Sequence, residues 1–157
     1  TTYQSGDWNW RIVFPIHDIN GKPVSWCGRT VDPDTKPKYK MSDNRHILVN
    51  PKEMIYGIHL AKDFVVIVEG ATDVWRLGVG AVAVLGIDWK MEQVSILRQF
   101  PRRYIMFDPE PQAQKQAQKL AENLSIYPGE TELITGLDSD PGDMDQKQAD
   151  AFMKSLK

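Results

Sequence analysis

Five consecutive apolar residues occupy positions 64–68, with the sequence Phe-Val-Val-Ile-Val. Four of the five are β-branched, which predicts a strand buried on both faces within a parallel sheet. Glu69 and Gly70 follow directly, and Thr72 or Asp73 can cap a helix that begins there. Open α/β sheets bind ligands at the carboxyl ends of their strands, so Glu69 stands at a predicted binding position.

Strands and helices keep alternating through the rest of the chain. Residues 81–85, 104–107 and 131–134 predict three further strands, and the segments between them carry apolar residues at helical spacing. Pro111 suits the first turn of one of these helices. Alternation of this kind implies parallel strands joined by right-handed crossovers, so we expect an α/β fold with a four-stranded parallel sheet and flanking helices.

The front of the chain has a different pattern. Residues 11–16 read as a strand, and Pro15 within it indicates an edge position or a bulge because proline cannot donate to a ladder. An Asn-Gly pair at 20–21 is a strong hairpin signal, and residues 24–31 predict the returning strand. Residues 51–62 can form a short helix that leads into the parallel sheet. A small β-rich unit is therefore expected ahead of the α/β unit.

Lysines alternate along the loop that follows the hairpin. Lys36, Lys38 and Lys40 are spaced by two, which in an extended chain places three ammonium groups on one side and Tyr39 on the other. Arg29 precedes them. This loop is the best candidate for contacts to a phosphate backbone. The alternative is an ordinary solvated loop with surface lysines.

The composition of the chain excludes several classes of protein. The 157 residues carry a net charge of −2 and are 41% hydrophobic and 25% charged, which is ordinary for a globular domain and argues against a uniformly basic nucleic-acid binder. A single cysteine excludes an internal disulfide and a multi-cysteine zinc site. No apolar run approaches the roughly 20 residues of a membrane span, and no signal peptide is evident. We expect a cytoplasmic protein without a membrane partner.

Three tryptophans lie in or near the predicted hairpin. Trp8, Trp10 and Trp26 could stack on unpaired bases. Packing inside the hairpin is the simpler interpretation, and we adopt it.

Carboxylates follow three of the four predicted strands. They are Glu69 after the first, Asp108 and Glu110 after the third, and Asp138, Asp140 and Asp143 after the fourth. In a parallel sheet these ends meet at one edge, where repulsion between acids is relieved by a hard cation such as Mg²⁺. Two such ions can stabilise the attacking and leaving oxygens of phosphoryl transfer. Caps and turns are the alternative use of these residues, but the whole group favours a metal site.

This ordered set of acids resembles a known domain. Val68-Glu69-Gly70 with Asp73, then Asp108-x-Glu110, then Asp140-Pro141-Gly142-Asp143, is similar to the Toprim domain. That fold is shared by DnaG-type primases, type IA and type II topoisomerases, OLD-type nucleases and recombination-mediator proteins. The resemblance covers residues 62–157 and implies a Rossmann-like parallel sheet, with residues 1–61 forming a separate β-rich basic subdomain.

The front half points to one of these families. The segment from Arg11 to Gly28-Arg29, followed by Lys36-Pro37-Lys38-Tyr39 and Tyr56-Gly57-Ile58, looks like the amino-terminal part of the DnaG-type primase catalytic core. The resemblance implies synthesis of short RNA primers from ribonucleoside triphosphates on a single-stranded DNA template. Bacterial or phage replication, with a replicative helicase as a further partner, is the implied setting.

The resemblance also implies roles for individual residues. Glu69, Asp108 and Glu110 would be catalytic, and together with Asp140 and Asp143 they would hold Mg²⁺ or Mn²⁺. The DNA- and nucleotide-binding residues would be Arg29, Lys36, Lys38 and Asp73. We expect the basic loop to lie away from the acids, on a different sheet edge or its far side, so that changing Lys38 leaves metal binding unaltered.

Some features depart from the family pattern. Glu110 stands where the family usually has aspartate, Pro109 and Pro111 flank it, and the sequence holds no counterpart of the zinc-ribbon or helicase-binding domains of bacterial primases. Two alternatives therefore stay open: a metal-dependent Toprim nuclease and a non-catalytic module that binds single-stranded DNA. The basic loop favours a primase over a nuclease, while Glu110 supports the non-catalytic alternative.

Overall fold

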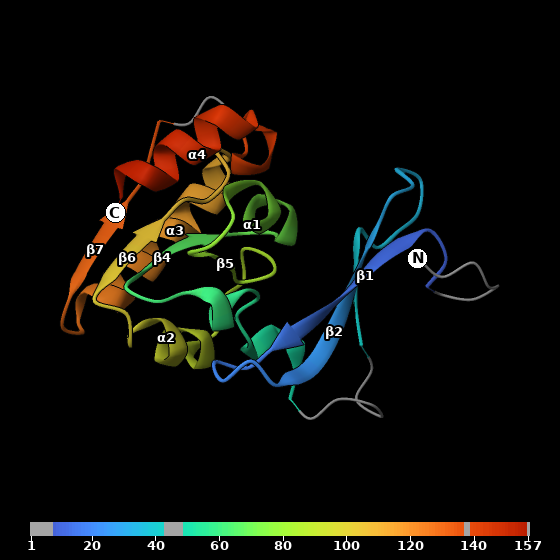
Figure 1. Cartoon of the computed structure of the whole chain (residues 1–157), viewed down its shortest axis with the longest axis horizontal. Coiled ribbons are helices and arrows are strands. Elements are labelled where there is room, and N and C mark those ends of the chain that lie inside the picture. The colour runs from blue at the N-terminus through green and yellow to red at the C-terminus, as the bar shows by residue number, and fades with distance from the viewer. Residues whose placement is uncertain (1–7, 43–48, 137–138, 157) are drawn as a thin grey trace.

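The computed structural model describes residues 8–42, 49–136 and 139–156, which form two sheets of different kinds (Figure 1). The first sheet is antiparallel, in the order β1-β2-β3, with β1 spanning Arg11–His17, β2 Pro23–Thr30 and β3 Tyr39–Met41. The predicted hairpin and the edge position of Pro15 are confirmed, since among the described strands β1 pairs only with β2. The side chain of Asp18 accepts the N–H groups of Asn20 and Lys22 and so closes the turn.

The second sheet is the expected four-stranded parallel one, and the α/β fold is confirmed. Its order is β5-β4-β6-β7, with β4 at Phe64–Val68, β5 at Ala81–Ala83, β6 at Arg102–Ile105 and β7 at Glu130–Leu133. The strand β4 is central and completely buried, as its apolar run requires. The strand β6 begins two residues earlier than predicted because the register pairs Arg102 with Phe64.

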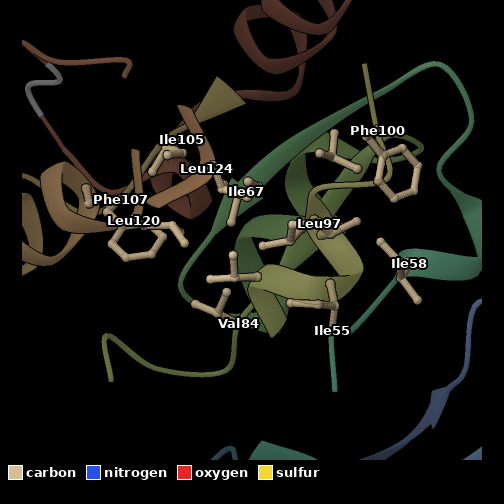
Figure 2. Packing of buried hydrophobic residues seen from close by; sticks show 14 of the residues in the cluster. Ile55, Ile58, Ile67, Val84, Leu97, Phe100, Ile105, Phe107, Leu120 and Leu124 are labelled. Carbon is tan, nitrogen blue, oxygen red and sulfur yellow. The ribbon is translucent and has the colours of Figure 1, made fainter. Parts of the chain in front are cut away.

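Helices cover both faces of the parallel sheet. They are α1 at Ala71–Leu77, α2 at Met91–Leu97, α3 at Pro111–Ser125 and α4 at Gln146–Ser155. Alternate residues of β4 supply two cores: Ile67 packs with Leu97 and Leu120 of α2 and α3, while Val66 and its neighbours pack with α1 and α4. Figure 2 shows the first of these cores, which holds the central strand rigidly.

The prediction of one short helix over residues 51–62 is wrong. The structure has two short 3₁₀ helices instead, η1 at Pro51–Glu53 and η2 at Ile58–Leu60. Between them Tyr56 exchanges two 2.9 Å backbone hydrogen bonds with Ala83 of β5, and Gly57 takes a left-handed φ of 84°. An α-helix cannot form there because the backbone of Tyr56 is paired with the sheet edge.

A third apolar cluster joins the two sheets. Phe14 of β1 contacts the rings of Tyr56 and Trp75 edge-on, with centroids 4.9 and 5.4 Å away. Trp75 belongs to α1, so this contact holds the hairpin beside the start of that helix. The antiparallel sheet therefore lies next to the carboxyl end of β4. No helix in the described ranges is long and apolar enough to cross a membrane.

Candidate active site

Glu69 organises the carboxyl edge of the parallel sheet. Its Oε1 atom accepts a 3.0 Å hydrogen bond from the backbone N–H of Asp108, which follows the adjacent strand β6. Its main-chain oxygen accepts the N–H of Gly86, beyond β5, also at 3.0 Å. Glu69 thus ties together the segments that leave three neighbouring strands.

Three carboxylates converge beside it. Asp108, Glu110 and Asp140 each offer an oxygen, and these oxygens lie within 4.8 Å of one another. Glu110 occupies the N-cap position of α3 without a capping side-chain hydrogen bond, and Asp140 stands before the 3₁₀ helix η3, Pro141–Asp143. Within the described part of the chain, Oδ1 of Asp108 is buried without a hydrogen-bond partner. An oxygen-only cluster with an unsatisfied buried carboxylate fits a hard divalent cation.

The acids disfavour one another's charge. Burial raises the pKa of Glu69 to about 7, and the charges of Glu110, Asp73 and Asp140 add to this effect. Burial likewise raises the pKa of Asp108 to about 7, with Glu69 as the largest of the neighbouring charges. The pKa of Asp140 is raised as well, first by burial and then by Glu110 and Asp143. A bound divalent cation would reverse this balance by stabilising the ionised forms.

Asp73 lies beneath this edge and links two loops. Its side chain is only 5% exposed, and Oδ2 accepts the N–H of Gly70 at 2.8 Å. A second backbone hydrogen bond comes from Gly142, between Asp140 and Asp143. A Cβ atom at position 142 would lie 2.7 Å from Oδ1 of Asp73, so only glycine fits there. Burial raises the pKa of Asp73, whereas the charge of Arg29 lowers it.

Basic residues of the hairpin face the acids across one pocket. Arg29 donates from Nη1 to the Tyr39 hydroxyl at 3.1 Å and to the Thr72 hydroxyl at the start of α1. The ammonium group of Lys38 lies close enough to Asp140 to lower the pKa of that carboxyl. The pocket has a volume of about 280 Å³. Its lining residues are Arg29, Lys38, Tyr39, Glu69, Gly70, Thr72, Asp73, Gly86, Asp108, Asp140, Gly142 and Asp143.

Two expectations about the basic loop are wrong. The loop does not lie away from the acids, because Phe14 and Arg29 fix the hairpin against α1. Tyr39 does not face away from Lys38 either, since both line the acid pocket. Lys36 lines an adjoining hollow, which shares Arg29 and Lys38 with the pocket.

The remaining expected residues take distinct positions. Asp143 is exposed at the rim of the pocket, and Glu110 is exposed while contributing to the carboxylate cluster. Asp138 lies outside the described residues. Sequence reasoning missed Tyr39 and Thr72, which hold Arg29. Tyr39 stands in the segment that carries the family resemblance and Thr72 is a candidate helix cap, but no local pattern shows that their hydroxyls meet Arg29.

Comparison with known proteins identifies the family. Residues 3–62 match the model of the DNA primase catalytic core, N-terminal domain. The DNA primase of Legionella pneumophila is 32% identical over 117 residues, covering 68% of this chain and 20% of that protein. The DNA primase of Neisseria meningitidis serogroup A is 36% identical over 124 residues, covering 72% and 21%. The chain belongs to the DnaG-type primase family.

Solved primase structures share the fold described above. The RNA polymerase domain of Mycobacterium tuberculosis primase DnaG superposes with a TM-score of 0.74 at 26% identity, over 93% of this chain and 54% of that one. A DnaG primase catalytic domain bound to single-stranded DNA gives 0.73 at 22% identity, over 94% and 51%. The chain spans about a fifth of the length of the curated DnaG-type relatives named here.

Proposed function

We propose that this chain is the catalytic core of a primase, an RNA polymerase that makes short primers on single-stranded DNA by metal-dependent nucleotidyl transfer. The observation that carries the proposal is the single pocket in which Arg29 and Lys38 face Glu69, Asp108 and Asp140. A cationic wall opposite a carboxylate cluster is what metal-assisted attack of a 3′-hydroxyl on a nucleoside triphosphate, with pyrophosphate as the leaving group, requires. Membership of the primase family supports the same function.

The metal-binding role falls to the carboxylates. Asp108, Glu110 and Asp140 would hold the first Mg²⁺ or Mn²⁺, since their oxygens already converge. Asp143, at the rim, would contribute to a second position, and Glu69 would hold the Asp108 backbone in place while adding negative charge. Bound Mg²⁺ supplies charge neutralisation at the phosphates and favours ionisation of the attacking 3′-hydroxyl.

The basic residues would bind the phosphates. The Arg29 guanidinium presents a planar set of donors, of which Nη1 is held by the Tyr39 and Thr72 hydroxyls, so its orientation is fixed before a phosphate arrives. Lys38 offers a point charge beside Asp140, where a triphosphate would meet the metal. Asp73 would support the site by accepting hydrogen bonds from the backbone of Gly70 and Gly142, which fixes the two loops that follow Glu69 and Asp140.

Ribonucleoside triphosphates as substrates, single-stranded DNA as template and a replicative helicase as partner complete the proposal. The proposal that single-stranded DNA is the template is supported by the related catalytic domain solved with single-stranded DNA. The triphosphates and the helicase rest on the family alone. No protein nucleophile is required, because the attacking group is the hydroxyl of the growing RNA.

One incubation separates this function from its alternatives. The chain is mixed with single-stranded DNA, labelled ribonucleotides and Mg²⁺, and the products are resolved by length. A primase yields short labelled RNA, a nuclease shortens the DNA, and a binding module does neither while still shifting the DNA. Asp108→Asn serves as the negative control, since it removes the charge at the centre of the cluster. Shortened DNA, or no labelled RNA at all, would contradict the proposal.

A further inference from the structure

We propose, on the basis of the primase function inferred above, that Trp10 is a stacking platform for an unpaired base of the template strand. Trp10 is 68% exposed, although the sequence interpretation placed it inside the hairpin. Its backbone is fixed, because the Trp10 oxygen accepts the N–H of Val31 at 2.8 Å and the hydroxyl of Thr30 at 3.3 Å. A fixed backbone with an exposed ring presents an aromatic face at low entropic cost.

The unusual conformation of Trp10 supports a role outside the core. Its φ is 55°, in the left-handed region that bulky residues rarely adopt. The neighbouring Trp8 behaves differently: its ring packs against the backbone of Gly28, and the Lys40 ammonium lies 5.2 Å from its centroid. Trp8 therefore packs on the hairpin as predicted, while Trp10 is exposed to solvent.

Cationic residues surround the exposed ring. Trp10 lines a hollow of about 400 Å³ together with Asn9, Arg11, Thr35, Lys36, Pro37 and Lys40. Among the residues that the structure describes, this lining contains three basic ones and no acidic one. Arg11 is 2% exposed and donates to the main-chain oxygens of Gly28 and Lys38, so it builds the wall, whereas Lys36 is exposed for phosphate contact. An aromatic face among lysines is the arrangement that holds single strands without sequence preference.

This hollow is linked to the acid pocket through shared lining residues. A middle hollow of about 270 Å³ shares Thr35 and Lys36 with the Trp10 hollow and shares Arg29 and Lys38 with the acid pocket. Its acidic lining residue is Asp32, whose carboxylate is occupied by the Thr35 hydroxyl at 2.6 Å and the Asp34 N–H at 3.1 Å. A strand can therefore follow basic groups from the carboxylates to Trp10.

The template is the strand that this path suits. Template bases that have not yet been copied are unpaired and free to stack, whereas the bases of the new RNA are paired with the template. Binding through one stacked base and two or three phosphates adds length to the template site without adding base specificity.

Anisotropy titrations with a labelled oligothymidylate of about 12 nucleotides test the proposal. Trp10→Ala should weaken binding roughly 5- to 100-fold, and Trp10→Phe should retain most of the affinity because it keeps an aromatic face. The slope of log affinity against log salt should stay unchanged in Trp10→Ala but fall by about 0.7 in Lys36→Ala. Ile126→Ala and Lys119→Ala, which change exposed residues on or beside α3, are the matched controls and should bind as the parent does.

The outcomes separate this inference from the proposed function. A parent chain that extends primers, with Trp10→Ala binding the oligothymidylate equally well, would overturn the stacking role and leave the primase function standing. If Trp10→Ala weakened the binding of a labelled oligouridylate but not of the oligothymidylate, the assignment to the template strand would be overturned. A parent that neither binds DNA nor extends primers would remove both. A circular-dichroism spectrum equal to that of the parent shows that each variant is folded.

Discussion

The Glu69 side chain accepts the backbone N–H of Asp108, with 3.0 Å between Oε1 and N. The contact joins the ends of two hydrogen-bonded parallel strands, β4 and β6. Glu69 thus combines a structural role, which needs only an acceptor oxygen, with an electrostatic role, which needs a charge. The two can be separated by mutation.

Glu69→Gln keeps the acceptor and removes the charge. We expect it to abolish nucleotide addition while raising the stability of the metal-free chain by about 1 kcal/mol, because burial and neighbouring acids make the ionised form costly. Calorimetry in EDTA should show a melting temperature about 2–4 °C higher. Normal polymerisation by this variant would remove Glu69 from the mechanism. Glu69→Ala, which also loses the acceptor, should be less stable than Glu69→Gln.

Asp108→Asn should remove most of the stabilisation that divalent ions give. A ligand that binds only the folded state at 100 times its dissociation constant adds about 2.7 kcal/mol. The parent should therefore melt at a higher temperature with Mn²⁺ than without it, and Asp108→Asn should show little change. Asp63→Asn, which changes an exposed residue just before β4, at the opposite end of that strand from Glu69, is the matched control and should respond like the parent. Equal responses in all three chains would place the metal elsewhere.

Lys38→Ala should strengthen metal binding while weakening the binding of nucleic acid. The ammonium group favours the ionised Asp140 and repels an incoming cation, so its removal should tighten Mn²⁺ binding by about 1.5- to 5-fold. The slope of log DNA affinity against log salt should fall by about 0.7. Lys36→Ala should change that slope but not the Mn²⁺ affinity, because Lys36 does not line the acid pocket. Isothermal titration of both variants provides the comparison.

Gly142→Ala should destabilise the chain by about 1–3 kcal/mol and weaken metal binding, because the new Cβ would lie 2.7 Å from Oδ1 of Asp73. In an Asp73→Ala background the same change should cost much less, since the clashing oxygen is gone. Urea unfolding of the two single variants and the double variant gives the coupling energy. Additive effects would show that position 142 does not act through Asp73.

The contribution of His59 to the stability of the chain should fall as the pH drops below about 6.5, the ordinary pKa of histidine. Burial, followed by the charge of His17, lowers the pKa of His59 in the folded state. At His59 the unfolded chain therefore binds a proton that the folded chain refuses, so this contribution is present at neutral pH and decreases on acidification. Glu69 and Asp108 act in the opposite direction, because their raised pKa values make protonation favour the folded state. His59→Gln should therefore become more stable relative to the parent as the pH falls from 7 to 5. An equal pH profile of the two chains in urea unfolding would exclude a contribution from His59.

The parallel sheet could be predicted because its strands are short apolar runs separated by helical periodicity. Residues 64–68 are buried without exception, as their composition requires. The helix over 51–62 failed because long-range pairing of Tyr56 with Ala83 overrides local preference. No local pattern reveals such a partner.

The candidate site was partly predictable for the same reason. Carboxylates at the ends of parallel strands must share an edge, so the proximity of Glu69 and Asp108 could be predicted, and the structure has them in contact. The placement of Arg29 and Lys38 against them depends on how the two sheets pack, through contacts such as Phe14 with Trp75. The exposure of Trp10 depends on its left-handed backbone, which composition does not encode.

The central position of β4 has a consequence for how the family can vary. Glu69 and Asp108 leave neighbouring strands, so the distance between them derives from the interstrand spacing of about 4.8 Å rather than from loop length. Insertions in the segment after β5 should therefore be tolerated without altering that separation. One residue inserted within β4 would instead reverse every side chain beyond it and turn Glu69 towards the opposite face of the sheet.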